Sequence, residues 1–382
     1  MELQLFMLSG LPDDVFELTE IEVITLELIP EVKLPSSVNQ LPNLKELNIY
    51  YSSLTVEFPA LNFLEENLKI LRLKSADLGK IPRWVFYLRN LQELYLTRCY
   101  VPEPQNGFYS EGFQDLVNLK TIYLRNSLSR IPQVITDQLP SLQKLSIDNE
   151  GRKLLVLTNL KKLLNLRTLE LISCDLERIP HSIFSLNHLR EIDLKDNNLR
   201  TVEEIISFQH LENLSCLKLW HNNISYIPVQ IGTLANLEQL YLNHNNIKKI
   251  PPQLFLCRKL SHLDLSYNKL TSIPDEIQYL TNLQYFAATK NHIEVLPDEL
   301  FQCKKLQHLL LGYNSLTQLS PQVGELSNLL HFELKGNYLE SLPAELEECN
   351  ALKRSCLIVE ECLLNMLPLR VIEPVQICLD KV

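Results

Sequence analysis

Residues 214–351 consist of six consecutive segments of 23 residues that repeat one pattern of leucine, asparagine and proline. The template is LxxLxLxxNxLxxIPxxIxxLxx. Segments of 23 to 28 residues with the same pattern continue back to residue 21. The fourteen segments begin at Ile21, Leu44, Leu68, Leu91, Leu119, Leu142, Leu166, Leu189, Leu214, Leu237, Leu260, Leu283, Leu306 and Leu329. Because every segment must adopt similar local structure and pack on its neighbours, this repetition restricts the chain to a stack of repeats.

Each segment predicts a short strand, a turn and a short helical return. Alternate leucines of LxxLxL point inward from a strand, and the residues between them point outward. The Ile/Leu-Pro step fixes φ and ends strand pairing. The pattern resembles the leucine-rich repeat, which implies an α/β solenoid with a curved parallel β-sheet on its concave face and short helices or 3₁₀ segments on its convex face. We expect one solenoid domain with a partial repeat at 1–20, about 14 repeats at 21–351 and a C-terminal cap at 352–382.

The ninth position of the template predicts a ladder of buried asparagines. A buried amide there can satisfy turn backbone groups that the strands leave unpaired. The predicted ladder comprises Asn197, Asn222, Asn245, Asn268, Asn291, Asn314 and Asn337. Cys174 takes the same position in its segment, and the sequence Asn149-Glu150-Gly151 is expected to break the ladder.

The pattern of the nine cysteines favours free thiols over disulfide bonds. Cys257, Cys303 and Cys349 occupy a position that is leucine in other segments, so we expect them in the core as small apolar side chains. The alternative is a disulfide-bonded flank, as in secreted repeat proteins, formed among Cys349, Cys356, Cys362 and Cys378. Reduced thiols of a cytosolic protein fit better, since the other end of the chain has no cysteine-rich flank.

Composition and motifs argue against catalysis and nucleic-acid binding. The net charge of −10 disfavours a general nucleic-acid-binding surface, and only 9 glycines are available for phosphate-binding loops. The sequence contains no GxxxxGK[ST], GxGxxG, HExxH or GxSxG motif. We therefore expect that the chain is not an enzyme and that it has no cofactor and no metal site. The sequence contains no run of 18 apolar residues, so it predicts no membrane-spanning helix.

The outward strand positions predict a protein-binding strip rich in aromatic and histidine side chains. Trp220, Tyr241 and Tyr285 are taken as outward strand positions in nearby segments. The next position along contributes His221, His244, Tyr267, Lys290 and Tyr313. Aromatic side chains are enriched at protein interfaces, although scattered exposed aromatics are also ordinary on protein surfaces.

Two further candidate contact regions lie in the first half of the chain. The earlier strands carry Arg72, Lys74, Arg98 and Arg125 facing roughly one way, a local basic patch that could meet an acidic segment of a partner. The segment at Leu91 is the longest, with its extra residues around 101–112 and Tyr109 among them. A long insertion is either a solvated loop or a contact loop.

The two ends of the chain differ in sequence. The repeat consensus fades after Leu352 into a stretch of mixed polarity, as expected of a closing cap. The N-terminus begins almost directly in strand-like sequence, which would leave the first strand uncovered. We therefore expect the chain to be part of a longer protein that continues before residue 1.

The irregular segments resemble one family, the leucine-rich-repeat-containing subunits of the volume-regulated anion channel. The segments that carry the resemblance are 142–151 (LQKLSIDNEG), 174–186 (CDLERIPHSIFSL), 203–211 (EEIISFQHL), 216–220 (CLKLW), 352–355 (LKRS) and 357–361 (LIVEE). The match is to the family's cytoplasmic C-terminal repeat domain and covers nearly the whole chain.

This resemblance implies a function that the composition does not indicate. Members of the family assemble as hexamers of different paralogues whose pore passes chloride and small organic osmolytes when cells swell. The chain would then be a regulatory and assembly domain on the cytoplasmic side of the plasma membrane. Its partners would be other channel subunits and cytosolic regulators bound through the concave face. The pore-forming part has no counterpart here, and the paralogue is left open.

One alternative is a free-standing cytosolic adaptor that scaffolds signalling proteins through the same face. A secreted binding receptor is another, and it requires disulfides among the last four cysteines.

Overall fold

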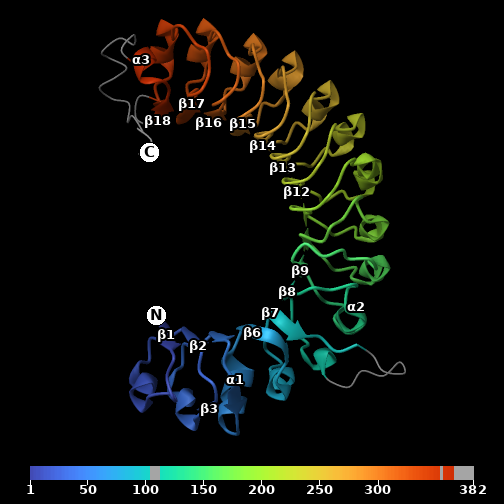
Figure 1. Ribbon diagram of the computed structural model, residues 1–382, viewed down its shortest axis with the longest axis vertical. Coiled ribbons are helices and arrows are strands. Elements are labelled where there is room, and N and C mark those ends of the chain that lie inside the picture. The colour runs from blue at the N-terminus through green and yellow to red at the C-terminus, as the bar shows by residue number, and fades with distance from the viewer. Residues whose placement is uncertain (104–111, 353–355, 365–382) are drawn as a thin grey trace. The chain divides into compact units, whose positions relative to one another are not determined.

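The computed structural model describes residues 1–103, 112–352 and 356–364 (Figure 1). It divides into two compact units, one of residues 1–175 with 180–189 and one of residues 176–179 with 190 onward. Each unit contributes eight described strands to a parallel sheet. The domain boundaries expected from the sequence stay predictions.

The first unit alternates strands with short helical segments. Its elements are β1 (Glu2–Phe6), η1 (Asp13–Glu17), β2 (Val23–Glu27), β3 (Val32–Leu34), η2 (Ser36–Gln40), β4 (Glu46–Tyr50), β5 (Leu54–Val56), α1 (Ala60–Asn67), β6 (Ile70–Lys80), η3 (Arg83–Tyr87), β7 (Glu93–Tyr100), η4 (Phe113–Asp115), β8 (Thr121–Arg125), α2 (Gln133–Gln138), β9 (Lys144–Asp148), η5 (Thr158–Lys162), β10 (Thr168–Ile172) and η6 (His181–Ser185). β3 and β5 pair in a small separate sheet.

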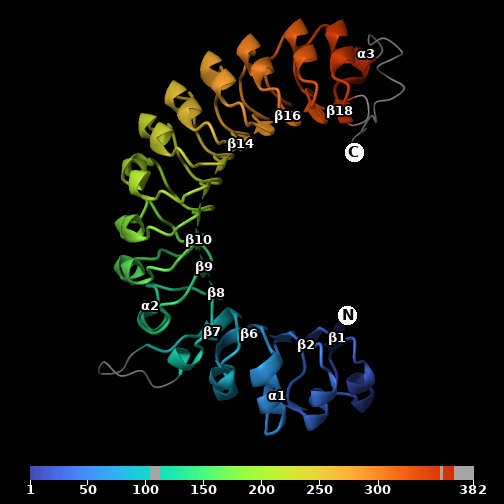
Figure 2. The same ribbon diagram turned by 180° about the vertical axis from the view of Figure 1, so that it is seen from behind.

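The second unit repeats the same alternation with shorter strands. Its elements are β11 (Glu191–Asp193), η7 (Glu203–His210), β12 (Cys216–Lys218), η8 (Val229–Thr233), β13 (Gln239–Tyr241), η9 (Pro252–Leu256), β14 (His262–Asp264), η10 (Asp275–Tyr279), β15 (Tyr285–Ala287), η11 (Asp298–Gln302), β16 (His308–Leu310), η12 (Pro321–Glu325), β17 (His331–Glu333), η13 (Ala344–Glu348), β18 (Cys356–Ile358) and α3 (Glu361–Leu364). Both views show that the helical segments of each unit lie on the side opposite its strands (Figures 1 and 2).

The template leucines form the core between the strands and the helical segments. In one segment Leu237, Leu240 and Leu242 are at most 1% exposed, and equivalent positions along the chain are as well buried. Proline precedes most helical segments with an extended backbone, as at Pro274 (φ −64°, ψ 147°) before η10. The prediction of a leucine-rich-repeat α/β solenoid with parallel strands and 3₁₀ returns is confirmed.

The asparagine ladder holds successive turns together. In a representative member, the amide of Asn268 accepts the N–H of Ile247 and donates to the carbonyls of Leu242 and Leu265, at 2.9–3.0 Å. Cys174 takes the same role with its thiol, which donates to the carbonyl of Ile147. Cys99, not singled out from the sequence, does the same toward Leu73.

The predicted break at Asn149-Glu150-Gly151 was wrong. Asn149 accepts the N–H of Leu128 at 2.7 Å and donates to the carbonyls of Leu128 and Arg152, so the ladder shifts by one residue instead of ending. The shift is possible because Glu150 and Gly151 both adopt positive φ, 52° and 79°, and carry the turn past the asparagine.

The cysteines expected in the core are buried there. Cys257, Cys303 and Cys349 are free, fully buried, and donate to the carbonyls of Ile231, Ile277 and Val323 respectively. Burial raises the pKa of the Cys257 and Cys303 thiols to about 12. Cys362 is free and exposed. The side chains of Cys356 and Cys378 lie outside the described residues.

Candidate protein-binding surface

In the second unit, side chains of the strands and of the turns that follow them form two rows made mostly of rings, which we call the strand row and the turn row. The strand row comprises Tyr241, His262, Tyr285, His308 and His331. Parallel pairing sets His262 beside Tyr285, Tyr285 beside His308, and His308 beside His331. Four of these rings stand two places after the first leucine of consecutive segments, a position that points outward, and Tyr241 stands two places further along its own segment.

Neighbouring rings of the strand row are in contact. The rings of Tyr241 and His262 lie 4.6 Å apart between centroids, and those of His262 and Tyr285 lie 4.0 Å apart and 5° from parallel. The separations from Tyr285 to His308 and from His308 to His331 are 5.8 and 6.0 Å. Five strands, β13 to β17, therefore carry one continuous series of rings.

The turn row comprises His221, His244, Tyr267, Lys290 and Tyr313, which follow the strands. All five adopt a left-handed backbone, with φ between 51° and 56°. This conformation is uncommon for residues other than glycine, and here it is fixed by the turn that each ladder asparagine closes. The row is therefore a property of the repeat, while the side chains displayed on it are a property of this chain.

The turn row is also stacked. The ring centroids of His221 and His244 lie 4.0 Å apart, as do those of His244 and Tyr267. The ammonium group of Lys290 lies over the rings of Tyr267 and Tyr313, at 4.8 and 5.5 Å. Tyr267 and Tyr313 remain 41% and 46% exposed, so rings stay available to a partner.

Burial favours the neutral form of several rings in the two rows. Burial lowers the pKa of His244, His262 and His331 below the usual value for imidazole. Burial also raises the pKa of Tyr285 to about 12. At neutral pH these imidazoles are therefore uncharged and stack as aromatic rings.

The sequence-based expectation for this surface needs one correction. Tyr241 lies in β13, in register with Lys218 and Asp264, and Tyr285 lies in β15, in register with His262 and His308, but Trp220, expected at an outward strand position, lies beyond the end of β12. Trp220 instead contacts His221, at 5.3 Å between ring centroids. Sequence reasoning also missed His262, His308 and His331, although their constant place two residues after a leucine could have revealed them.

The predicted basic patch of the first unit is largely neutralised by carboxylates. Arg72 pairs with Glu46 at 2.9 Å, and its guanidinium lies 3.8 Å from the centre of the Tyr95 ring. The ammonium group of Lys74 lies over the ring of Tyr51.

The other two arginines of this patch share one carboxylate. Arg98 and Arg125 both approach Glu150, at 3.5 and 3.8 Å, and Arg125 also pairs with Asp148. Tyr109, the other candidate contact residue of this unit, lies outside the described residues.

The two rows offer binding chemistry. They present stacked rings, hydroxyl and imidazole groups and one ammonium group, the side-chain types that are enriched at protein interfaces.

Within residues 1–103, 112–352 and 356–364, no three His, Cys, Asp or Glu side chains are grouped to hold a metal ion. A search of the same residues finds no helix with the length and apolarity needed to cross a bilayer.

Comparisons with known proteins agree with this fold. The chain matches the family described as leucine rich repeat at residues 165–224, 204–247 and 235–293. Residues 11–135 match the BspA type leucine rich repeat region. A leucine-rich-repeat protein of Leptospira interrogans, LIC12759, superposes with a TM-score of 0.75 and 28% identity, covering 97% of this chain and 93% of its own.

Curated relatives share much higher identity. The human volume-regulated anion channel subunit LRRC8B is 78% identical over 380 residues, which cover 100% of this chain and 47% of the human protein. The human subunit LRRC8A is 59% identical over 262 residues, covering 69% of this chain and 32% of that protein. The matched region thus covers about half of the length of human LRRC8B and about a third of the length of human LRRC8A. From this identity and its repeats, the chain belongs to the LRRC8 family of volume-regulated anion channel subunits, whose leucine-rich-repeat region it spans.

Proposed function

We propose that this chain is the cytoplasmic regulatory and assembly region of a volume-regulated anion channel subunit and acts by binding other proteins rather than by catalysis. The observation that supports it most is the 78% identity with human LRRC8B along the whole chain. The conducting pore would lie in a part of the subunit outside this chain, which supplies no membrane-spanning helix in its described residues.

The two rows of rings are the proposed contact surface. Interface energy concentrates in a few well-packed aromatic and charged anchors, and stacked rings lose little side-chain entropy when a partner covers them. We propose that the partner is another subunit of the same hetero-oligomeric channel, a hexamer in this family, or a cytosolic protein that regulates it.

The proposed mechanism is a shift between closed and open populations of the channel. A bound partner changes gating only if it contacts the repeat region differently in the two states. The repeats suit this role because adjacent segments share a continuous core and hydrogen-bonded turns, so a contact on one strand is transmitted through packed neighbours. Chloride and organic osmolytes would leave the swollen cell through the pore that this region controls.

The test uses the full-length subunit, expressed with the other family subunits in cells that lack it. The variant combines Tyr241→Ala, Tyr285→Ala and Trp220→Ala, which remove rings from the strand row and from the edge of the turn row. The matched control is Tyr279→Ala, which removes a 48% exposed ring from η10 on the opposite side of the unit. Readouts are surface expression, co-purification of the other subunits and swelling-activated anion current.

We expect the triple variant to reach the surface and to alter either the co-purified subunits or the current by severalfold, while the Tyr279 control matches wild type. Unchanged current and unchanged subunit composition at wild-type surface expression would rule out this surface as the contact site. Finding the native protein as a soluble cytosolic chain rather than in the membrane fraction would instead support an adaptor.

A further inference from the structure

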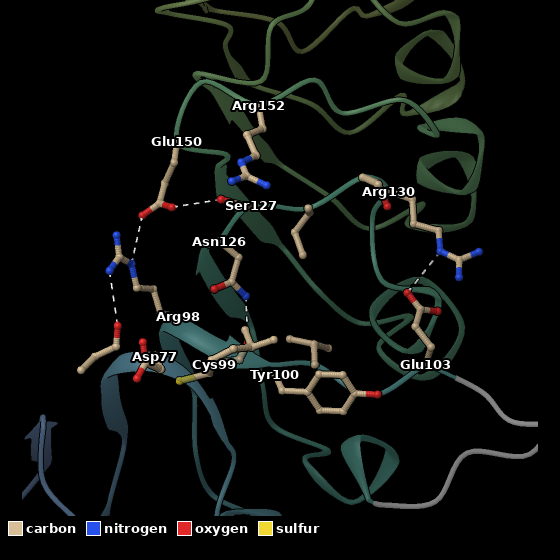
Figure 3. A pocket seen from close by; sticks show the side chains of 15 residues that line it. Asp77, Arg98, Cys99, Tyr100, Glu103, Asn126, Ser127, Arg130, Glu150 and Arg152 are labelled. Carbon is tan, nitrogen blue, oxygen red and sulfur yellow. Dashed lines mark hydrogen bonds and ion pairs between the residues drawn. The ribbon is translucent and has the colours of Figure 1, made fainter.

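A separate pocket lies in the first unit, at the carboxyl ends of β6, β7, β8 and β9 (Figure 3). Its cavity volume is about 610 Å³, within the range of small-molecule sites. The pocket exists because β6 and β7 continue for 11 and 8 residues, past the point where strands of the second unit end. A register shift between Lys74 and Gly79 accompanies the extension of β6.

The pocket holds one guanidinium group without a carboxylate partner. Among its arginines, Arg98 pairs with Glu150 at 3.5 Å and Arg130 with Glu103 at 3.4 Å. Arg152 also lines the pocket, and within the described residues no ion pair or hydrogen bond involves its side chain. An unpaired guanidinium presents a planar set of donors that suits the oxygens of a phosphate or carboxylate.

The same pocket holds two buried acceptors without donors. Asn126 is 3% exposed and donates to the carbonyl of Cys99 at 2.8 Å, but its Oδ1 has no partner. The Oε2 atom of Glu103 is likewise buried without a partner. Figure 3 places Asn126 at the centre of the lining residues, between Arg98 and Arg152 on one side and Tyr100 on the other.

The unpaired oxygen of Asn126 follows from the strand extension. In the next segment, Asn149 receives the N–H of Leu128, which has left the strand by that point. Tyr100 holds the corresponding place before Asn126, yet it continues β7 and pairs with Lys80 of β6. The ladder donor is therefore missing at this one turn, and a buried acceptor without a donor costs about 1–3 kcal/mol.

We propose that this pocket binds a small organic oxyanion, a phosphate monoester or carboxylate that also carries hydroxyl or amino donors. Arg152 binds the oxyanion. The donors of the ligand satisfy Asn126 Oδ1 and Glu103 Oε2, and the exposed side chains of Leu78 and Tyr100 at the rim cover its carbon skeleton. The site is independent of the two rows of rings and of the proposed channel function.

The experiment titrates the 382-residue chain by calorimetry with ribose 5-phosphate and with gluconate, which distinguish phosphate from carboxylate. Inorganic phosphate and ribose are the two partial probes. Variants are Arg152→Gln, Arg152→Lys, which keeps the charge but not the planar donors, and Arg200→Gln, which removes an equal charge outside this pocket. Arg152 and Arg200 are both exposed, so the variants are expected to fold, which thermal melting checks.

We expect saturable binding of at least one of the two hydroxylated anions at millimolar concentration or below. Arg152→Gln should weaken it about tenfold or more, Arg152→Lys should restore it only in part, and Arg200→Gln should leave it unchanged. The proposal is overturned if neither anion binds saturably, if Arg152→Gln binds as wild type does, or if inorganic phosphate binds as tightly as ribose 5-phosphate.

Discussion

The imidazole of His262 lies flat on the phenol ring of Tyr285, with centroids 4.0 Å apart and planes 5° from parallel. The two residues are 23 positions apart in sequence and are paired directly across β14 and β15. A ring at the same place in consecutive repeats thus becomes a stack, because parallel strands lie about 4.8 Å apart. Because the rings are in contact, the charge gained when one imidazole is protonated also acts on the neighbouring rings.

Acidification is expected to destabilise the second unit through His262. Burial lowers its folded-state pKa, with a further lowering from His308 and an opposing effect of Asp264. The unfolded chain therefore takes up the proton first as pH falls, and the free energy of unfolding decreases below about pH 6.5. His262→Gln should reduce the loss of thermal stability between pH 7.5 and 5.5 relative to wild type. An equal loss in both proteins, or an imidazole NMR titration of His262 above pH 6.5, would contradict this assignment.

Removing one ladder asparagine should cost far more than removing its exposed neighbour. Asn268→Ala leaves the N–H of Ile247 and the carbonyls of Leu242 and Leu265 without their side-chain partner. We expect a loss of about 2–3 kcal/mol in the free energy of unfolding, measured by urea denaturation. Lys269→Ala, at the adjacent exposed position, should stay within about 0.5 kcal/mol of wild type. Equal effects of the two substitutions would show that the amide bonds contribute little.

The thiols should separate into slow and fast classes. With a pKa of about 12, only about one Cys257 thiol in ten thousand is ionised at pH 8, and its burial blocks access as well. Cys362 is exposed and should react with a thiol reagent within minutes. Cys257 and Cys303 should be labelled only after unfolding. Mass-spectrometric mapping of labelled peptides checks this, and labelling of native Cys257 at the rate of Cys362 would contradict the buried assignment.

Much of the fold could be predicted because the repeat fixes both the inward face and the turn. The strand leucines, the asparagine ladder from Asn197 onward and the buried thiol of Cys257 all follow from position within the template. The shift at Asn149 could not be predicted in this way. It depends on two successive residues with positive φ, one of which, Glu150, has no strong preference for that conformation.

The candidate site was predictable only in part, for a different reason. Outward positions are evident along one segment, but their neighbours come from segments 23 or more residues away. Glu150 neutralises Arg98 and Arg125 from other segments, so counting basic residues alone overestimates the patch. His308 and His331 occupy the same place in their segments as Tyr285, but reading each segment alone does not show that the three rings are neighbours, which requires alignment of the segments in register.

Two glycines allow backbone strain to be separated from steric clash. Gly336 has φ +81°, and a Cβ added there would lie 2.5 Å from Cδ1 of Tyr313, in the turn row. Gly151 has φ +79° but nothing within 4 Å of an added Cβ. Gly151→Ala should therefore lower the free energy of unfolding by about 1 kcal/mol, the cost of a positive φ at alanine. Gly336→Ala should lower it by about 1–2 kcal/mol more, because of the steric clash. Urea denaturation of each variant measures the difference.

Combining Gly336→Ala with Tyr313→Ala tests the cause of that difference. Tyr313→Ala removes the ring that the new methyl group would meet, so the extra cost of Gly336→Ala should disappear in the double variant. The added methyl group would otherwise displace the Tyr313 ring and with it the contact that this ring makes with Lys290. If the two substitutions were instead additive, the extra cost of Gly336→Ala would persist without the Tyr313 ring. Contact between the added methyl group and that ring would then be excluded as its cause.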